Sequence, residues 1–147
     1  MKRRDHEPPA ATERWGWRYH HTGIPTTEQR HGEEYLPEFR MYVTGFAESP
    51  YGIEWMRFEA DSPVSELVRT VPHVAFEVDD IVKALRGKTV LSAPNSPSVG
   101  VRAAMIVDNG CPIELIEFSG RDTNGRVGAV EQRDAADEAQ GGTRTAS

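Results

Sequence analysis

Two segments of the chain carry the same types of potential metal ligand in the same order. His21 is followed by Glu54, and His73 is followed by Glu114, at separations of 33 and 41 residues. The flanking residues also correspond, His21–Ile24 with His73–Phe76 and Ile53–Phe58 with Ile113–Phe118. Duplicated units with different internal loops give similar but unequal separations. The pattern therefore predicts two copies of one structural unit, each supplying a histidine and a glutamate.

The four side chains together favour a divalent metal ion. Imidazole nitrogens and carboxylate oxygens suit zinc, nickel, cobalt, iron and manganese, and the sequence does not choose among these. A single histidine at the start of a strand is more often capped or partly buried than bound to a metal, so neither His21 nor His73 alone indicates a site. A glutamate in an apolar strand, however, is costly to bury unless a cation compensates its charge. Because Glu54 and Glu114 occupy matching positions, we expect a buried metal site.

The composition argues against several classes of partner. The chain has 147 residues, a formal charge of −6 and an isoelectric point near 5.4, which is unsuited to a nucleic-acid-binding surface. Cys111 is the single cysteine, so no internal disulfide forms, and we interpret it as a packing residue. The sequence has no signal peptide and no long apolar run, so we expect a cytoplasmic protein that does not associate with membranes.

The two ends of the chain differ from its middle. Residues 1–13 are charged and contain Pro8 and Pro9, and residues 120–147 have hardly any large apolar side chain. Such segments bury too little apolar surface to order themselves. We expect a disordered arm at 1–13, a single folded domain at 14–119 and a disordered tail at 120–147.

The folded domain reads as two strand-rich modules, at about 15–60 and 71–119. Period-two alternation and short apolar runs predict strands at Tyr19–Pro25, Phe39–Phe46 and Gly52–Glu59, and then at His73–Val78, Thr89–Leu91, Val101–Val107 and Pro112–Phe118. Asp80 is expected to cap a short helix that ends before Gly87. The matching segment Thr26–Pro37 is polar and irregular, so the helix of the first module is expected to be short or absent. The predicted fold is α+β, with a βαβββ module repeated in tandem.

Strand alternation places the candidate ligands on one face of a curled sheet. His73 shares its face with Ala75 and Glu77, while the opposite face of the same strand is apolar and is expected to pack on the helix. Each module's last strand likewise puts Glu54 or Glu114 on the same face as two apolar residues. We expect the histidines and glutamates to line the concave side, where small residues leave room for a ligand.

On these residues, the segment Tyr19–Phe118 resembles the vicinal oxygen chelate superfamily, which includes glyoxalase I, extradiol dioxygenases, methylmalonyl-CoA epimerase and the fosfomycin and bleomycin resistance proteins. The strings that carry the resemblance are Pro72–Asp80, Asp108–Gly110 and Pro112–Phe118. In that superfamily two βαβββ modules form a cup-shaped mixed sheet with a divalent metal at its floor. The resemblance implies this glyoxalase-like fold and the metal ligands His21, Glu54, His73 and Glu114.

His20 competes with His21 for the first ligand position. Adjacent residues of a strand face opposite ways, and His21–Ile24 matches His73–Phe76, so His21 is the expected ligand.

The resemblance also implies a reaction type. The metal would bind two neighbouring oxygens of a small-molecule substrate and act as a Lewis acid. Four ligands are similar to the set of the proton-transferring members, so we expect a metal-dependent lyase, isomerase or epimerase. The alternatives are an Fe(II) extradiol-type dioxygenase, similar to members with three ligands, and a non-enzymatic small-molecule-binding or resistance protein. Candidate catalytic bases are Glu54, Glu77 and Glu114, and the alternative role of Glu77 is an ion pair with Arg102 or Arg40.

An aromatic and basic segment, Trp15–Tyr19, precedes the first predicted strand. We expect it to pack on the outside of the cup or against a second subunit rather than to close over the substrate. Members of the superfamily that the chain resembles usually pair as dimers, and an open sheet has exposed edges. We therefore expect a homodimer that involves Trp15–Tyr19.

Overall fold

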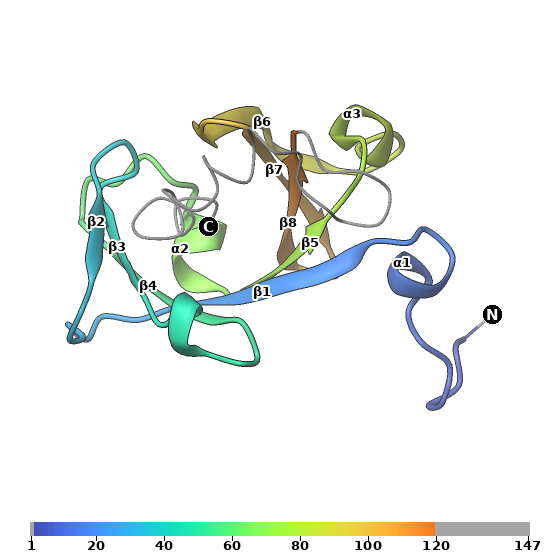
Figure 1. Cartoon of the computed structure of the whole chain (residues 1–147), viewed down its shortest axis with the longest axis horizontal. Coiled ribbons are helices and arrows are strands. Elements are labelled where there is room, and N and C mark those ends of the chain that lie inside the picture. Colours follow the sequence, from blue (N-terminus) through green and yellow to red (C-terminus); the bar gives the residue numbers. More distant parts are fainter. Residues whose placement is uncertain (1, 120–147) are drawn as a thin grey trace.

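The computed structural model describes residues 2–119, and one curled eight-stranded sheet runs through most of them (Figure 1). The strands lie side by side in the order β2-β3-β4-β1-β5-β8-β7-β6. Their bounds are β1 (Arg18–Pro25), β2 (Glu34–Leu36), β3 (Met41–Thr44), β4 (Ile53–Phe58), β5 (His73–Glu77), β6 (Val90–Ser98), β7 (Val101–Asp108) and β8 (Cys111–Phe118). The tail expected at 120–147 lies outside the described residues.

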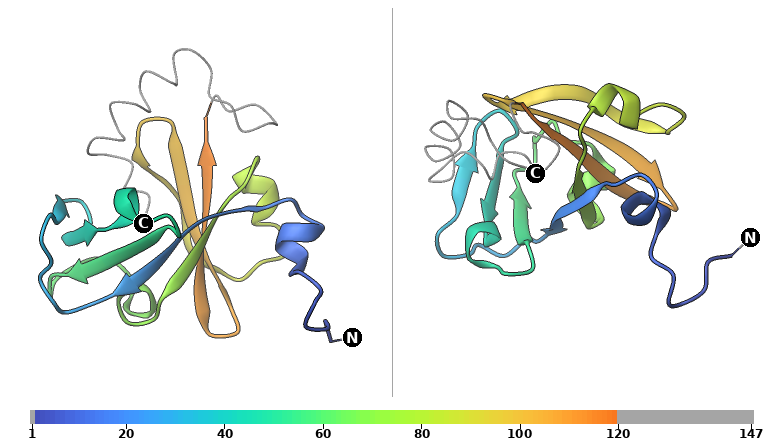
Figure 2. Two further views of the ribbon diagram at one scale, coloured as in Figure 1. Left: turned by 60° about the horizontal axis from the view of Figure 1, so that its bottom comes forward. Right: turned by 45° about the vertical axis from the view of Figure 1, so that its right-hand side comes forward.

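The two halves of the sheet repeat one pairing scheme. In each half the first strand pairs in parallel with the last, β1 with β4 and β5 with β8. The other pairs within each half are antiparallel. β1 and β5 run antiparallel at the centre and join the halves (Figure 2). The predicted α+β fold, with tandem modules in one curled mixed sheet, is therefore confirmed.

A short helix follows β5, as the sequence predicts. This helix, α3 (Ile81–Ala84), begins after Asp80, whose carboxylate accepts a hydrogen bond from the backbone N–H of Lys83 at 3.1 Å. The Asp80 side chain thus satisfies a backbone N–H group that would otherwise lack a partner at the start of the helix.

Two other helices were not predicted. α2 (Glu66–Thr70) lies in the connection between the modules, and Ser65 caps it by accepting from the N–H of Val68. α1 (Ala10–Glu13) lies in the segment that we expected to be a loose arm, which projects from one end of the sheet (Figure 2). The remaining helical element is a 3₁₀ turn, η1 (Phe46–Glu48), between β3 and β4.

Between β1 and β2 the first module has a loop where the second module has α3. The loop is anchored to β4 by two polar contacts. Glu33 receives two hydrogen bonds from Arg57, at 2.6 and 2.8 Å, and the guanidinium of Arg30 lies 4.7 Å from the ring centre of Trp55. A bidentate ion pair and a cation–π contact thus hold this segment without a helix.

The edge strand β6 is longer than predicted. The sequence indicated a strand at Thr89–Leu91, but β6 continues to Ser98. Its pairing with β7 shifts register three times, and the extra length includes Pro94 and Pro97. An edge strand with bulges accommodates prolines that a central strand would exclude, which is why the sequence pattern stopped too early.

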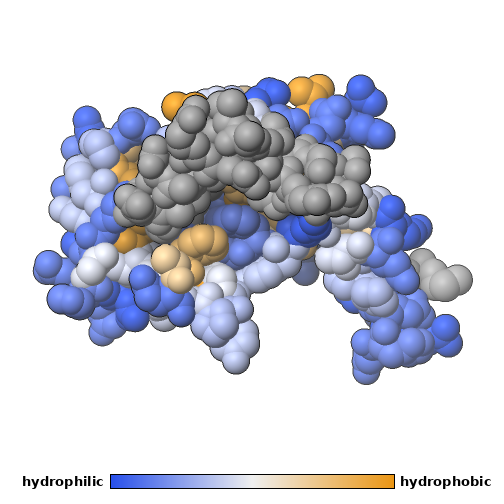
Figure 3. Space-filling model, viewed as in Figure 1, coloured by the Kyte–Doolittle hydropathy of each residue, from blue (hydrophilic) through white to orange (hydrophobic). Residues whose placement is uncertain are grey.

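Apolar side chains gather on both sides of the sheet. Trp17 and Ile81 belong to the cluster on the α3 side, where the ring centre of Trp17 lies 5.9 Å from that of Phe76. Met41 and Met56 belong to a second cluster in the first module. The outer surface is mostly hydrophilic in the view of Figure 3. Within residues 2–119, no helix has the length and apolar character needed to cross a membrane.

Candidate metal centre

The four predicted ligands lie on the four central strands in two neighbouring rows. Gly23 on β1 is in register with Glu54 on β4 and with His73 on β5. Ala75 on β5 is in register with His21 on β1 and with Glu114 on β8. Each row therefore has a very small residue in the middle and larger polar residues on either side. This arrangement follows from the repeated pairing scheme, and it brings the histidine and glutamate of each repeat into a single site.

Three donor atoms of this set converge closely. Nε2 of His21 lies 3.2 Å from Nε2 of His73 and 3.2 Å from Oε1 of Glu114, and Nε2 of His73 lies 3.1 Å from the same oxygen. All three side chains are buried, with at most 2% of their surface exposed. The corners of this triangle lie about 1.8 Å from its centre, close to the roughly 2.0–2.2 Å at which imidazole nitrogens and carboxylate oxygens bind zinc. The cluster His21, His73 and Glu114 therefore fits a divalent metal ion.

Glu54 lies beside this cluster rather than within it. Its Oε1 is 3.8 Å from Nε2 of His21, and its side chain is 1% exposed. The carboxylate is thus close enough to join the ligand set after a small movement, or to handle a proton next to it.

The charge state of Glu114 suits it to bind a cation. Burial raises the pKa of a carboxyl group because the charged form loses its water. Hydrogen bonds and electrostatic attraction from the rings of His21 and His73 outweigh this effect of burial, and the net result holds the pKa of Glu114 below its ordinary value. Glu114 is therefore a carboxylate at neutral pH.

A β-bulge gives His21 a histidine partner that the sequence analysis missed. The pairing of β1 with β5 shifts register between Tyr19 and His21, so strict alternation fails at His20. Nδ1 of His20 lies 2.7 Å from Nδ1 of His21, and the His20 ring stacks on Phe46 at 5.0 Å. The second nitrogen of His21 is therefore held by a neighbour while Nε2 points to the cluster. His20 itself stays outside the cluster.

The structure keeps Glu77 apart from the cluster. Although Glu77 is buried, its Oε2 lies 3.3 Å from Arg18, which also bonds Asp79 at 2.9 Å. The ion-pair partners suggested by the sequence were wrong. Arg102 lies near Glu117, at 3.6 Å, and Arg40 near Asp61, at 2.9 Å. Arg18 is adjacent to Glu77 because β1 and β5 pair at those positions.

Cys111 occupies the start of β8 and donates a weak hydrogen bond from Sγ to the carbonyl of Pro72 at 3.4 Å. Burial, together with the nearby charge of Asp108, raises the pKa of the thiol. A thiol that stays protonated is a poor nucleophile, in agreement with its interpretation as a packing residue.

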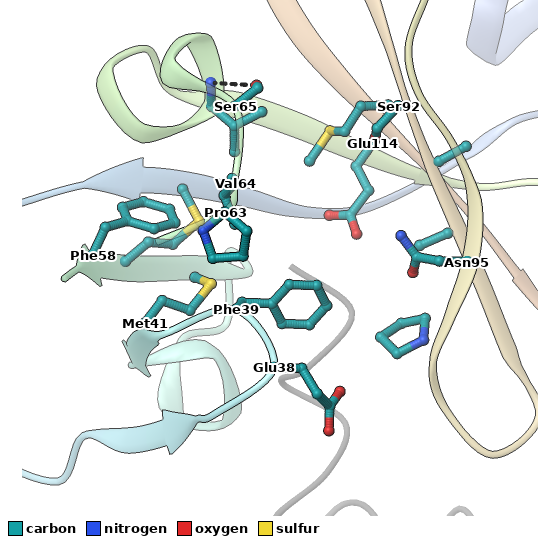
Figure 4. Close-up of a pocket in the computed structure, with 16 residues that line it drawn as sticks. Glu38, Phe39, Met41, Phe58, Pro63, Val64, Ser65, Ser92, Asn95 and Glu114 are labelled. Atoms are coloured by element: carbon teal, nitrogen blue, oxygen red, sulfur yellow. Dashed lines mark hydrogen bonds between the residues drawn. The ribbon is translucent and has the colours of Figure 1, made fainter. Parts of the chain in front are cut away.

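A pocket of about 260 Å³ opens beside the cluster, with the carboxylate of Glu114 at its floor (Figure 4). Its walls come from both modules and from the connection before α2. Phe39 and Val64 stand on one side, and Asn95 of β6 stands on the other. A ligand in this pocket would reach the donor cluster directly.

One comparison with solved structures supports the fold. No protein-family model and no curated protein matches the sequence. Among solved structures, the chain is similar to the hypothetical protein BH1468 from Bacillus halodurans C-125, with a TM-score of 0.56, 18% identity, and coverage of 74% of this chain and 99% of that one. A glyoxalase/bleomycin resistance protein/dioxygenase from Nocardioides matches with a TM-score of 0.28, 18% identity, and coverage of 81% and 78%.

The curled mixed sheet, with its repeated parallel pairing of first and last strands, is the glyoxalase-like fold that the sequence resemblance implied. At its centre the chain carries a buried cluster able to bind a divalent metal.

Proposed function

We propose that the chain is a metal-dependent enzyme of the vicinal oxygen chelate type, a lyase, isomerase or epimerase acting on a small oxygenated substrate. The observation that carries this proposal is the convergence of three buried donor atoms within 3.2 Å of one another at the floor of a pocket. A bound divalent ion would supply Lewis-acid chemistry toward two neighbouring oxygens of the substrate.

The chain's own residues divide into two roles in this proposal. His21, His73 and Glu114 hold the ion, and His20 orients His21. Glu54 moves the proton, because its carboxylate lies next to the cluster and is less tightly engaged with the two imidazoles than Glu114 is. A base that is not fixed as a ligand can accept a proton without first leaving the metal. The apolar pocket walls keep bulk water from the reacting carbon.

A second candidate function is an Fe(II) ring-cleaving dioxygenase. The observation that favours it is that the tight cluster contains two histidines and one carboxylate, the donor set of many non-haem iron oxygenases. Metal content and turnover separate the candidates. Ferrous iron together with oxygen-dependent ring cleavage of catechol would favour the dioxygenase.

The first test is metal binding. We expect one divalent ion per chain in purified protein, measured by elemental analysis. His73→Ala and Glu114→Gln should each lower the metal affinity at least about tenfold, since each removes a ligand. Glu117→Gln is the matched control because Glu117 lies on the same strand and bonds the N–H of Ile81 instead. Unchanged metal affinity in both ligand variants would refute the metal centre.

The second test is proton exchange in D₂O with 2-hydroxyacetophenone, whose two oxygens are vicinal and whose CH₂ protons are acidic. We expect exchange by the metal-loaded protein, its loss in Glu54→Gln with metal retained, and its persistence in Glu77→Gln. Exchange that survives in metal-loaded Glu54→Gln, Glu77→Gln and Glu114→Gln alike would rule out a carboxylate base.

A further inference from the structure

The pocket beside the cluster has an uneven charge distribution. Its lining includes two carboxylates, Glu114 at the floor and Glu38 at the mouth (Figure 4). Among the lining residues within 2–119 there is no lysine, arginine or histidine. Away from an ion bound at the floor, an anionic group in this pocket would therefore find no compensating cation and would meet the like charge of Glu38.

The wall on the side of the first module is almost entirely apolar. It is formed by Phe39, Met41, Met56 and Phe58, and the connection to α2 adds Val64. Met41 and Met56 are 1% and 0% exposed, so they form a buried part of the wall, and thioether side chains adapt to ligands of different shape. Contact with this wall stabilises a bound apolar group, whereas a charged group there would have no hydrogen-bond or ion-pair partner.

The opposite wall combines apolar residues of β6 and β7 with polar groups that are neutral. Ser92 and Asn95 of β6 line it, and Asn95 extends toward the pocket in Figure 4. An amide and a hydroxyl can orient a carbonyl or hydroxyl group of a ligand without requiring a charge. The volume of about 260 Å³ sets the size of the enclosed part, since a cavity of about 150 Å³ accommodates benzene.

We infer that the substrate of the proposed reaction is a small apolar molecule, about one substituted ring in size, that carries no negative charge on the part lying in this pocket. This inference rests on the proposed function for the position of the chelating oxygens, which would face the cluster. The inferred charge and polarity of the rest of the substrate depend only on the residues that line the pocket.

The test uses three catechols that share the chelating oxygens and differ in the charge of a short side arm. They are 4-ethylcatechol, dopamine and 3,4-dihydroxyphenylacetate. Binding to metal-loaded protein is measured by calorimetry without oxygen. We expect the neutral and ammonium probes to bind and the carboxylate probe to bind at least about tenfold more weakly, because the pocket walls give its charge no cationic partner and Glu38 lies at the mouth. Equal or tighter binding of the carboxylate probe would overturn the inference.

A charge reversal at the mouth of the pocket gives an independent check. Glu38 is exposed, so Glu38→Lys should fold normally and should reduce the disadvantage of the carboxylate probe. Glu13→Lys, a reversal on the distant helix α1, is the control and should leave the ratio unchanged. An identical probe ratio in the two variants would show that the pocket does not set the preference.

Chelator-treated protein separates this inference from the proposed function. There the matched probes are ethylbenzene, phenethylamine and phenylacetate, which lack the chelating oxygens, and binding is followed by NMR shifts of the pocket methionine methyl groups. The same order of binding is expected even if the protein proves to bind no metal. Failure of all six probes to bind would overturn the inference, whereas failure of metal binding alone would overturn only the proposed function.

Discussion

The backbone of Gly23 lies directly against the imidazole ring of His73. The two residues are in register on β1 and β5, and a Cβ atom added at Gly23 would stand 2.7 Å from Nδ1 of that ring. The ring can occupy its position in the cluster only because residue 23 has no side chain.

Gly23→Ala should therefore disrupt the metal centre without removing a ligand. The added methyl group forces the ring of His73 away from its partners, and we expect a loss of metal affinity of about tenfold or more. Overpacking should also lower the free energy of unfolding by about 1–3 kcal/mol. Competition with a chromophoric chelator measures the affinity. Thr22→Ala is the control on the same strand. If Gly23→Ala and Thr22→Ala bound the metal with equal affinity, the absence of a side chain at residue 23 would not be needed for the site.

His20→Ala should weaken metal binding although His20 lies outside the cluster. With Nε2 of His21 as the ligand atom, Nδ1 of His21 would carry the hydrogen and donate a hydrogen bond to Nδ1 of His20. Removing that acceptor should cost about tenfold in affinity, at the low end of losses seen for such supporting residues. His31→Ala, in an exposed loop, is the matched control. Equal affinities in the two variants would show that the bulge at His20 has no part in the site.

The ion pair between Glu33 and Arg57 should make the stability of the fold depend on pH. Hydrogen bonds from Arg57 hold the pKa of Glu33 below its ordinary value. A depressed folded-state pKa stabilises the fold above the unfolded value, about 4.3, and this contribution disappears as pH falls through the folded value.

Glu33→Gln should accordingly melt a few degrees lower at pH 7 and lose less stability than wild type below about pH 5. Thermal unfolding between pH 3 and pH 7 by circular dichroism, in steps of about half a unit, measures both effects. Glu28→Gln, exposed in the same loop, should follow the wild-type curve. Parallel pH curves for the two variants would contradict the assignment.

We also propose that the chain forms a homodimer through Trp15–Tyr19. Trp15 and Tyr19 are each 49% exposed, whereas Trp17 between them packs on the cluster beside α3. Sedimentation should give twice the chain mass of 16.4 kDa, and Trp15→Asp should shift the equilibrium toward monomer. Val99→Asp, at an exposed apolar position elsewhere, should have no such effect. A monomeric wild-type protein at micromolar concentration would exclude the dimer.

The sequence allowed the hairpin of β7 and β8 to be predicted because its constraints are local. The period-two pattern and the turn at Asn109-Gly110, where both residues have positive φ, define β7 and β8 almost to the residue. The repeated histidine and glutamate then indicated which strands must meet.

Features that depend on distant neighbours could not be predicted in the same way. The bulge at His20 leaves no composition signal, since it is visible only in the register between β1 and β5. The partner of Glu77 depends on the same register, which brings Arg18 beside it. The pocket wall combines Phe39, Val64 and Asn95, which are far apart in sequence and come together only through the curvature of the sheet.

The antiparallel contact of β1 with β5 has a further consequence for how the site comes into existence. Each half of the sheet contributes one histidine and one glutamate to the site, so half of the chain has an incomplete set of donors, and a bound ion would link the two halves. Metal binding should therefore raise the free energy needed to separate the two halves far more than the free energy needed to detach either edge strand, β2 or β6. An ancestral single module could have offered the same four donors only by pairing with a copy of itself.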